Sequence, residues 1–203
     1  PWGEYGSRYV EHFMPLFREL GCKTLLDYGS GIESLREALA RDHPDIDVRC
    51  YDQGVIGREV APEPADFVVC TDMLEHVEPD LIDNVLQHIN KLTVRGAYLR
   101  IGMAQAKRLL CDGRNAHILL KPRQWWWGKL KQHGFNVVME GGGKKTFIVH
   151  IKATQQLDRE AERRKYEFAY DHSKYQMGVK RGADARCDLE ALPIRGSYLD
   201  VSC

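Results

Sequence analysis

The amino-acid sequence predicts an α/β fold built on a doubly wound sheet, for three reasons. Short apolar segments of strand type alternate along the chain with segments of helical periodicity. Such alternation is typical of parallel strands joined by right-handed helical crossovers. A glycine-rich loop, Gly29-Ser30-Gly31, follows the first strand segment, and Gly141-Gly142-Gly143 separates the last two. That closing glycine turn predicts a hairpin, which adds an antiparallel strand to a mostly parallel sheet.

The individual elements follow from the spacing of apolar residues and from turn signals. Helices are assigned where apolar residues recur three or four positions apart, and strands where short apolar runs end at turn residues. In chain order we expect a helix over 13–20 stopped by Gly21, a strand over 23–28, a helix with Ile32, Leu35 and Leu39 on one stripe, strands over 46–51 and 65–70, a helix over 81–92, a strand over 97–101, a short helix over 124–132, and strands over 135–139 and 146–151.

Composition and charge exclude several classes of protein. Hydrophobic residues make up 43% and charged residues 29% of the 203 positions, as in ordinary soluble domains. The formal net charge is zero, so no overall basic footprint points to nucleic acid, although a local basic patch stays open. No apolar run reaches the roughly 18–20 residues of a membrane span. We therefore expect a cytoplasmic protein without membrane association.

The chain termini and the cysteines give further expectations. The N-terminus lacks the pattern of a signal peptide and does not begin with Met, so we expect the sequence to start inside a longer protein. The cysteines contain no C-x-x-C pair, and we expect reduced thiols rather than a disulfide framework or a zinc site.

The glycine loop points to a nucleoside-containing ligand. In a doubly wound sheet, ligands bind at the carboxyl ends of the strands, at the topological switch point. Asp52 ends the next strand, where a carboxylate can accept both hydroxyls of a ribose. A dinucleotide would place its pyrophosphate beside Asp27 and Glu33 and would want a third glycine where Ser34 stands. The carboxylates favour the ammonium and sulfonium cations of S-adenosylmethionine (SAM).

Several segments together resemble the class I SAM-dependent methyltransferases. Residues 25–31 are similar to motif I of that family, and Asp52 to its ribose-binding acidic residue. Residues 65–77, ending in Leu74-Glu75-His76-Val77, resemble the fourth-strand motif of the ubiquinone-biosynthesis-like branch, while 95–101 and 134–138 resemble the next two strands. The resemblance covers roughly residues 1–152. It implies a Rossmann-like fold and SAM as cofactor, held by Asp27, Gly29, Ser30, Gly31, Asp52, Gln53, Asp72, Met73 and Leu74.

One departure from the family concerns the segment after Asp52. Only a dozen residues separate Asp52 from the strand that begins at Ala65. This is too short for the helix and third strand that the family usually has there. The loop that contacts adenine in the family therefore has no assigned counterpart in this sequence.

The resemblance implies methyl transfer, and the sequence offers three candidate catalytic residues. An in-line displacement needs alignment and exclusion of water, and a general base only where the acceptor loses a proton. Glu75 and His76 follow a strand end, and His117 precedes the last helix. The alternatives are a helix cap or a solvent-facing position for the first two and a structural role for His117. Methyl transfer requires no metal, and no metal site is predicted.

The acceptor is expected to be a small molecule or a nucleotide-like compound. Successive helical residues are ~100° apart, so one helix face cannot bury all of Trp125-Trp126-Trp127. One Trp could stack on a planar acceptor, or the run could be core packing with one surface Trp. Neighbouring basic residues fit an anionic acceptor or a solvated helix face: Lys121, Arg123, Lys129 and Lys131. The oligomeric state is not readable. Rival functions are a catalytically silent SAM-binding or partner-binding module and an NAD(P)-dependent oxidoreductase.

The C-terminal part predicts a change of domain. Residues 1–152 form the methyltransferase-like domain, and the highly charged segment 153–174 reads as a linker helix. Residues 175–203 partly repeat the start of the chain, since Leu199-Asp200 aligns with Leu26-Asp27. We expect these residues to begin a second, truncated methyltransferase-like domain. The alternative is an extra edge strand or a disordered tail.

Overall fold

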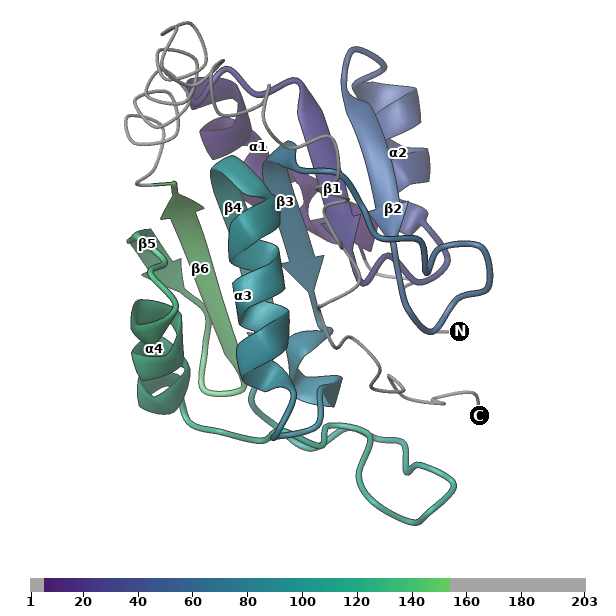
Figure 1. The fold of residues 1–203 in the computed structure, drawn as a ribbon, viewed down its shortest axis with the longest axis vertical. Helices are drawn as coiled ribbons and strands as arrows, with labels where there is room; N and C mark the ends of the chain where they lie inside the picture. Colours follow the sequence, from purple (N-terminus) through teal and green to yellow (C-terminus); the bar gives the residue numbers. More distant parts are fainter. Residues whose placement is uncertain (1–5, 154–203) are drawn as a thin grey trace, which may run out of the picture. The chain divides into compact units, whose positions relative to one another are not determined.

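The computed structural model describes residues 6–153, which contain one mixed sheet of six strands (Figure 1). The strand order is β2-β1-β3-β4-β6-β5. β2, β1, β3 and β4 are parallel, whereas β6 runs antiparallel to both β4 and β5. The prediction of a Rossmann-like doubly wound sheet, mostly parallel with a C-terminal antiparallel hairpin, is confirmed.

The elements follow the predicted order along the chain. The strands are β1 (Thr24–Tyr28), β2 (Asp47–Tyr51), β3 (Ala65–Thr71), β4 (Thr93–Gly102), β5 (Val137–Gly141) and β6 (Thr146–Lys152). The helices are α1 (Val10–Glu19), α2 (Ser34–Asp42), α3 (Ile82–Leu92) and α4 (Arg123–Gln132), with two short 3₁₀ turns, η1 (Gly6–Tyr9) and η2 (Leu74–His76).

Helices cover both faces of the sheet because its central strands are apolar on both sides. Side chains alternate between the two faces of a strand. Leu25 and Phe67 pack with α1 and α2, whereas the next residues, Leu26 and Val68, pack with α3 and α4. In Figure 1, α3 and α4 lie in front of the sheet and α1 lies behind it. Continuous burial on both faces is what parallel strands require.

The segment between β2 and β3 is a loop, as its length predicted. Residues 52–64 contain no helix or strand, and β2 stays at the edge of the sheet. One detail of the preceding prediction is wrong. Ile32 was expected on the buried stripe of the helix but is 51% exposed. The cause is Glu33, whose φ of 65° is left-handed and delays the start of α2 to Ser34.

Two expectations from the sequence, the absence of a membrane span and the reduced state of the cysteines, can be compared with the structure. Within residues 6–153, none of the helices combines the length and apolar character that crossing a bilayer requires. Cys22, Cys50 and Cys70 are free thiols, whereas Cys111 is disulfide-bonded. The expectation of reduced cysteines is therefore wrong for Cys111.

The predictions for the end of the chain lie outside the described residues. The linker helix over 153–174 falls there apart from Ala153, and the truncated second domain over 175–203 falls there entirely.

Phe67 offers a test of the core behind the sheet. Its ring is fully buried, with centroids 6.0 Å from Phe13 and 5.6 Å from Phe17. Replacing Phe67 with Ala leaves a cavity between β3 and α1, and we expect a loss of about 3–5 kcal/mol in the free energy of unfolding, measured by urea denaturation. Val138→Ala, at a position 46% exposed on β5, is the control and should cost less than about 1 kcal/mol. Equal losses would contradict this account of the core.

Candidate functional site

The site lies where the chain reverses its direction of travel across the sheet. From β1 the chain moves outward to β2 and then returns to β3 on the other side of β1. The crevice between the carboxyl ends of β1 and β3 is thus the topological switch point. Gly29 follows β1 with a φ of 84°, and a Cβ at this residue would lie 2.6 Å from Met73 Cγ. The absent side chain lets the loop after β1 pack directly against the end of β3.

Backbone hydrogen bonds tie the glycine loop to the end of β2. The N–H groups of Gly29 and Ser30 donate to the carbonyl of Tyr51, at 2.7 and 3.2 Å. Gly31 N donates to Asp52 Oδ2 at 2.8 Å. The second carboxylate oxygen, Oδ1, accepts from Gly54 N at 2.8 Å. The structure therefore brings the predicted loop residues and Asp52 together and holds the Asp52 carboxylate in a defined orientation.

Asp27 and Asp52 give this crevice an electrostatic preference for cations, whereas two arginines offset the charge of a third carboxylate, Glu33. Asp27 is 4% exposed at the end of β1. Its pKa is raised to about 7, mainly by loss of hydration and in smaller part by the nearby charges of Asp52 and Glu33. Glu33 forms ion pairs with Arg36, at 3.0 Å, and with Arg58. A cation in the crevice would favour the ionised form of Asp27.

Asp72 anchors the other side of the crevice through partners that sequence reasoning missed. Asp72 has a left-handed φ of 53° and forms an ion pair with Arg100 of β4. Tyr9 donates its hydroxyl to Asp72 Oδ2 at 3.2 Å, and the Arg100 guanidinium lies 4.8 Å from the Tyr9 ring centroid. The sequence did carry one signal: Arg100 is a charged residue within the otherwise apolar run from Ala97 to Ile101.

The remaining predicted cofactor residues differ in their surroundings. Ser30 is 4% exposed, and its Oγ makes no hydrogen bond within the described residues. Gln53 is exposed on the loop after β2. Leu74 is fully buried and packs in the core with α3. The Leu74 side chain therefore contributes to the core and not to an exposed cofactor surface.

The three predicted catalytic residues come together at the same edge of the sheet. Glu75 and His76 lie on η2 after β3, and His117 lies on the loop after β4. The two imidazole rings are 4.9 Å apart between centroids and nearly perpendicular. Glu75 is fully buried, so the alternative of a solvent-facing Glu75 is wrong. We call these three residues the histidine–carboxylate cluster.

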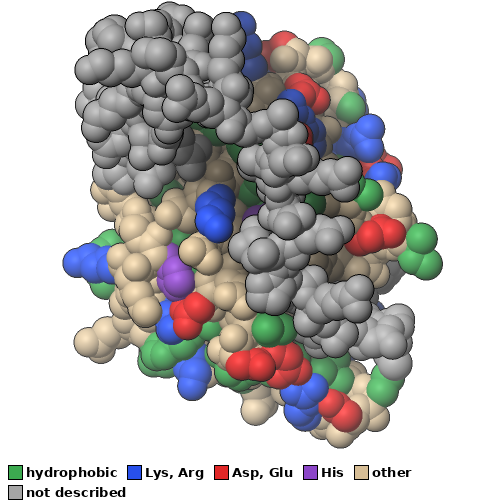
Figure 2. Space-filling model, viewed as in Figure 1, with side chains coloured by type: hydrophobic (Ala, Val, Ile, Leu, Met, Phe, Trp, Pro, Cys, Tyr) green, Lys and Arg blue, Asp and Glu red, His purple; other side chains and the backbone are tan. Residues whose placement is uncertain are grey.

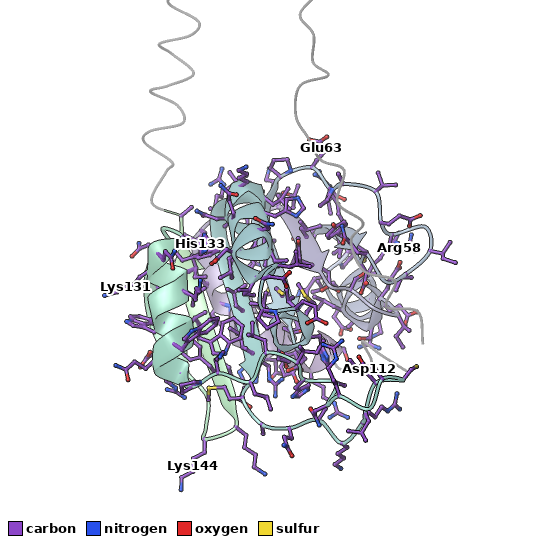
Figure 3. All side chains as sticks on the ribbon, turned by 60° about the horizontal axis from the view of Figure 1, so that its bottom comes forward. Arg58, Glu63, Asp112, Lys131, His133 and Lys144 are labelled. Atoms are coloured by element: carbon purple, nitrogen blue, oxygen red, sulfur yellow. The ribbon has the colours of Figure 1, made fainter. Side chains whose placement is uncertain are left out.

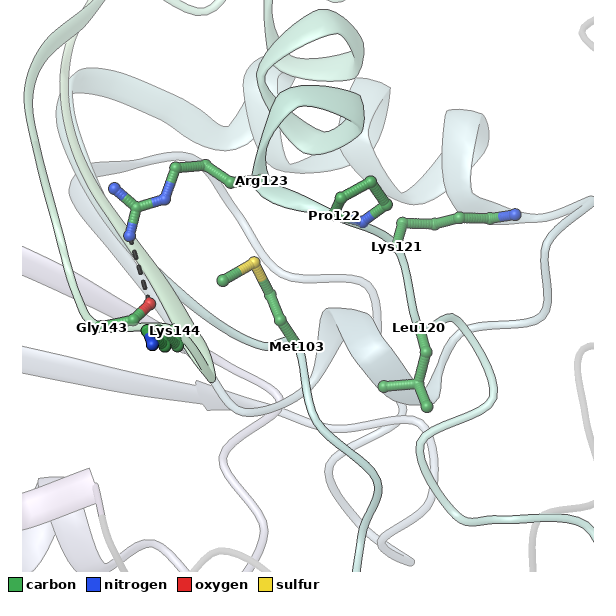
Figure 4. Close-up of a pocket in the computed structure, with 7 residues that line it drawn as sticks. All are labelled: Met103, Leu120, Lys121, Pro122, Arg123, Gly143 and Lys144. Atoms are coloured by element: carbon green, nitrogen blue, oxygen red, sulfur yellow. Dashed lines mark hydrogen bonds between the residues drawn. The ribbon is translucent and has the colours of Figure 1, made fainter.

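A pocket of about 620 Å³ opens beside the end of β4 (Figure 4). In Figure 3, where the lower end of Figure 1 comes forward, Lys144 lies at the tip of the β5–β6 hairpin and points away from it. Arg123 donates to the carbonyl of Gly143 and so fixes this rim to α4. The lining combines apolar and cationic side chains and comprises Met103, Leu120, Lys121, Pro122, Arg123, Gly143 and Lys144.

The tryptophan run contributes to the core rather than to this pocket. Trp126 is fully buried, and Trp125 and Trp127 are half-buried against the same core. None of the three lines the pocket beside β4. The structure thus agrees with the core-packing alternative and gives no support to stacking of a Trp on the acceptor.

Gly29→Ala tests the contact that closes the crevice. In this variant the backbone strain of a left-handed Ala is added to a collision between its Cβ and Met73. Gly113→Ala has the backbone strain alone, because Gly113 has a φ of 83° and no atom lies within 4 Å of the added Cβ. We expect Gly113→Ala to cost about 1–2 kcal/mol of unfolding free energy and Gly29→Ala roughly 1–3 kcal/mol more. Adding Met73→Ala to Gly29→Ala should recover part of the difference. Equal costs for the two glycines in urea denaturation would contradict the contact.

Asp27 predicts a pH-dependent stability. Its folded pKa of about 7 lies above the ordinary value of 3.8, so its contribution to stability is fully present below about pH 4 and is lost as the pH rises through about 7. The unfolding free energy of the wild type, relative to Asp27→Asn, should therefore fall between pH 4 and 7, by up to roughly 4 kcal/mol. Denaturation of both proteins across this range measures the difference, and parallel profiles would contradict a raised pKa.

No protein-family model and no curated protein sequence matches this chain. Solved structures do match it. A magnesium protoporphyrin IX methyltransferase from Synechocystis PCC 6803 is 17% identical, with a TM-score of 0.52 over 73% of this chain and 79% of that chain. A Burkholderia thailandensis 1,6-didemethyltoxoflavin-N1-methyltransferase is 16% identical, with a TM-score of 0.52 over 74% and 79%.

A mitomycin 7-O-methyltransferase is 15% identical, with a TM-score of 0.51 over 73% of this chain. This chain spans only 60% of that enzyme's length. At these identities the likeness shows a shared fold and does not carry over an acceptor. The chain therefore has the Rossmann-like fold found in SAM-dependent methyltransferases.

Proposed function

We propose that this protein is a SAM-dependent methyltransferase that moves a methyl group to an oxygen or nitrogen atom of a small-molecule or nucleotide-like acceptor. The observation that carries the proposal is the set of carboxylates around the glycine loop at the switch point. Asp27 belongs to β1 just before this loop, Glu33 precedes α2 just after it, and Asp52 accepts a hydrogen bond from Gly31 within it. SAM carries an ammonium and a sulfonium, whereas a dinucleotide would bring its pyrophosphate to these carboxylates.

In the proposed complex each part of the crevice has a separate task. Asp52 is held by Gly31 and Gly54 and can accept hydrogen bonds from both ribose hydroxyls. Asp27 and the loop after β1 face the cationic amino-acid end. When bound, SAM supplies a methyl carbon that an acceptor lone pair attacks, while the electrons of the C–S bond return to sulfur and yield S-adenosylhomocysteine. The chain contributes alignment and the exclusion of water.

The acceptor would enter at the pocket beside β4. Met103 of the pocket follows Gly102, whose N–H donates to Glu75 Oε1 at 2.8 Å, and a Cβ added at Gly102 would lie 3.1 Å from His117 Cε1. The pocket thus adjoins residues that can orient an acceptor and take up its proton. Its apolar wall and the cations Lys121 and Lys144 suit a compact molecule that carries an anionic group.

A small acceptor fits the surface better than a nucleic acid does. On the face shown in Figure 2, basic and acidic side chains of the described residues are interspersed. Nucleic-acid binding usually depends on a continuous basic stripe. Two of the solved methyltransferases described above are named for small acceptors, magnesium protoporphyrin IX and 1,6-didemethyltoxoflavin, which supports the same class of acceptor here.

Calorimetric titration with SAM, S-adenosylhomocysteine, NAD⁺ and NADP⁺ tests the cofactor assignment. We expect binding of SAM and its product and no binding of either dinucleotide. Asp52→Asn weakens two hydrogen bonds to the ribose, and the Kd for SAM should rise about 10- to 100-fold. Asp47→Asn is the matched control, because Asp47 is exposed at the opposite end of the same strand. Dinucleotide binding without SAM binding would refute the proposal in favour of an oxidoreductase.

The remaining alternative is a catalytically silent module that binds SAM or a partner protein. Transfer of label from methyl-labelled SAM to fractions of a cell extract, nucleic acids included, separates the two. Labelled product together with S-adenosylhomocysteine supports the enzyme. SAM binding without transfer to any fraction supports the silent module.

A further inference from the structure

The histidine–carboxylate cluster has the composition of a metal site. Glu75, His76 and His117 each present one ligand atom, and these atoms all lie within 4.8 Å of one another. The residues come from two loops at the same sheet edge, one after β3 and one after β4. Their convergence is therefore a product of the fold and not of a local sequence run.

Both imidazoles are oriented as metal ligands usually are. His76 Nδ1 lies 2.7 Å from the carbonyl oxygen of Ala116, and His117 Nδ1 lies 2.5 Å from that of Ala104. A carbonyl oxygen only accepts hydrogen bonds, so each Nδ1 carries the proton. In the neutral form of each ring, the lone pair that could bind a metal is then on Nε2. Metal-binding histidines typically have their tautomer fixed by such a hydrogen bond from the other nitrogen.

Glu75 supplies the second, independent observation. Its side chain is fully buried, and Oε1 accepts from Gly102 N at 2.8 Å. Oε2 is also buried and has no hydrogen-bond partner within the described residues. A buried carboxylate oxygen without a partner is costly. A bound cation would supply the missing partner.

We propose that Glu75, His76 and His117 bind one divalent transition-metal ion, with Zn²⁺ the best match. Two imidazole nitrogens and one carboxylate oxygen are a ligand set of catalytic zinc sites, which keep a further position open. Ligand atoms around a tetrahedral Zn²⁺ lie about 3.4 Å apart, so the widest pair must close by at most about 1.4 Å. The proposal departs from the sequence-based expectation that no metal is required.

The open coordination position would allow the ion to bind the acceptor in the proposed function. The cluster lies near the pocket beside β4, since Gly102 N donates to Glu75 Oε1 and the next residue, Met103, lines the pocket. An ion there would hold the acceptor atom and lower the pKa of its hydroxyl or amine, and the three side chains would act on the acceptor through the ion. This role rests on the proposed methyl transfer, whereas metal binding itself does not.

Metal binding is tested on the untagged full chain after removal of metal with a chelator. Calorimetry with Zn²⁺ should show one site per chain, and Co²⁺ should produce the visible absorption bands of a four- or five-coordinate ion. His117→Ala and the near-isosteric Glu75→Gln should each weaken Zn²⁺ binding at least about 100-fold, because loss of an outer-shell partner alone costs 10- to 100-fold. His12→Ala, at an exposed position on α1, is the matched control and should bind as the wild type does.

Circular dichroism and SAM titration of the same variants keep the outcomes distinct. Variants that remain folded and bind SAM with unchanged Kd but lose Zn²⁺ support the metal site. Zn²⁺ binding by the wild type without SAM binding upholds the metal site and refutes the proposed function. No Zn²⁺ or Co²⁺ binding by the wild type, or binding that Glu75→Gln and His117→Ala both retain, overturns the metal site.

Discussion

The parallel pairing of β1 with β3 is the constraint on which the rest of the site depends. Leu25, Leu26 and Asp27 pair in register with Phe67, Val68 and Val69. Successive residues of both strands alternate between two helix-covered cores, so a shift by one residue would move apolar side chains to the wrong face. The same register brings the carboxyl ends of the two strands side by side. The contact between Gly29 and Met73 then closes the base of the crevice.

The crevice is built at a cost to the folded state. Asp27 is buried near two other carboxylates, which raises its pKa to about 7, and Asp72 is held in a left-handed conformation beside Arg100. Buried charge and backbone strain both reduce stability unless something compensates them. A cationic ligand would relieve the first cost on binding. The apolar packing of α1 and α3 on opposite faces of the sheet stabilises the fold. This stabilisation offsets the cost of the buried Asp27 and of the strained backbone at Asp72.

The histidine–carboxylate cluster follows the same logic on the neighbouring strand end. Glu75 is buried with one oxygen lacking a partner in residues 6–153, while Gly102 leaves room for it, since a Cβ there would lie 2.4 Å from Glu75 Oε1. The sheet edge thus holds two distinct centres that each contain a buried carboxyl group, Asp27 near β1 and β2 and Glu75 near β3 and β4. In the proposed function, the cofactor binds near Asp27 and the acceptor binds near Glu75.

The sequence by itself determined the order and type of the elements and the place of the glycine loop. These features depend on local properties: apolar spacing, turn residues, and the short segment between Asp52 and Ala65 that leaves no room for a further strand. Tertiary structure alone decided that Arg100 and Tyr9 meet Asp72, that Glu75 is buried, and that His117 lies beside His76. Tertiary packing also buries Trp126 in the core and places Trp125 and Trp127 against it. The physical reason is that a side chain at the end of a strand is oriented by the packing of elements distant in the chain, which no local pattern encodes.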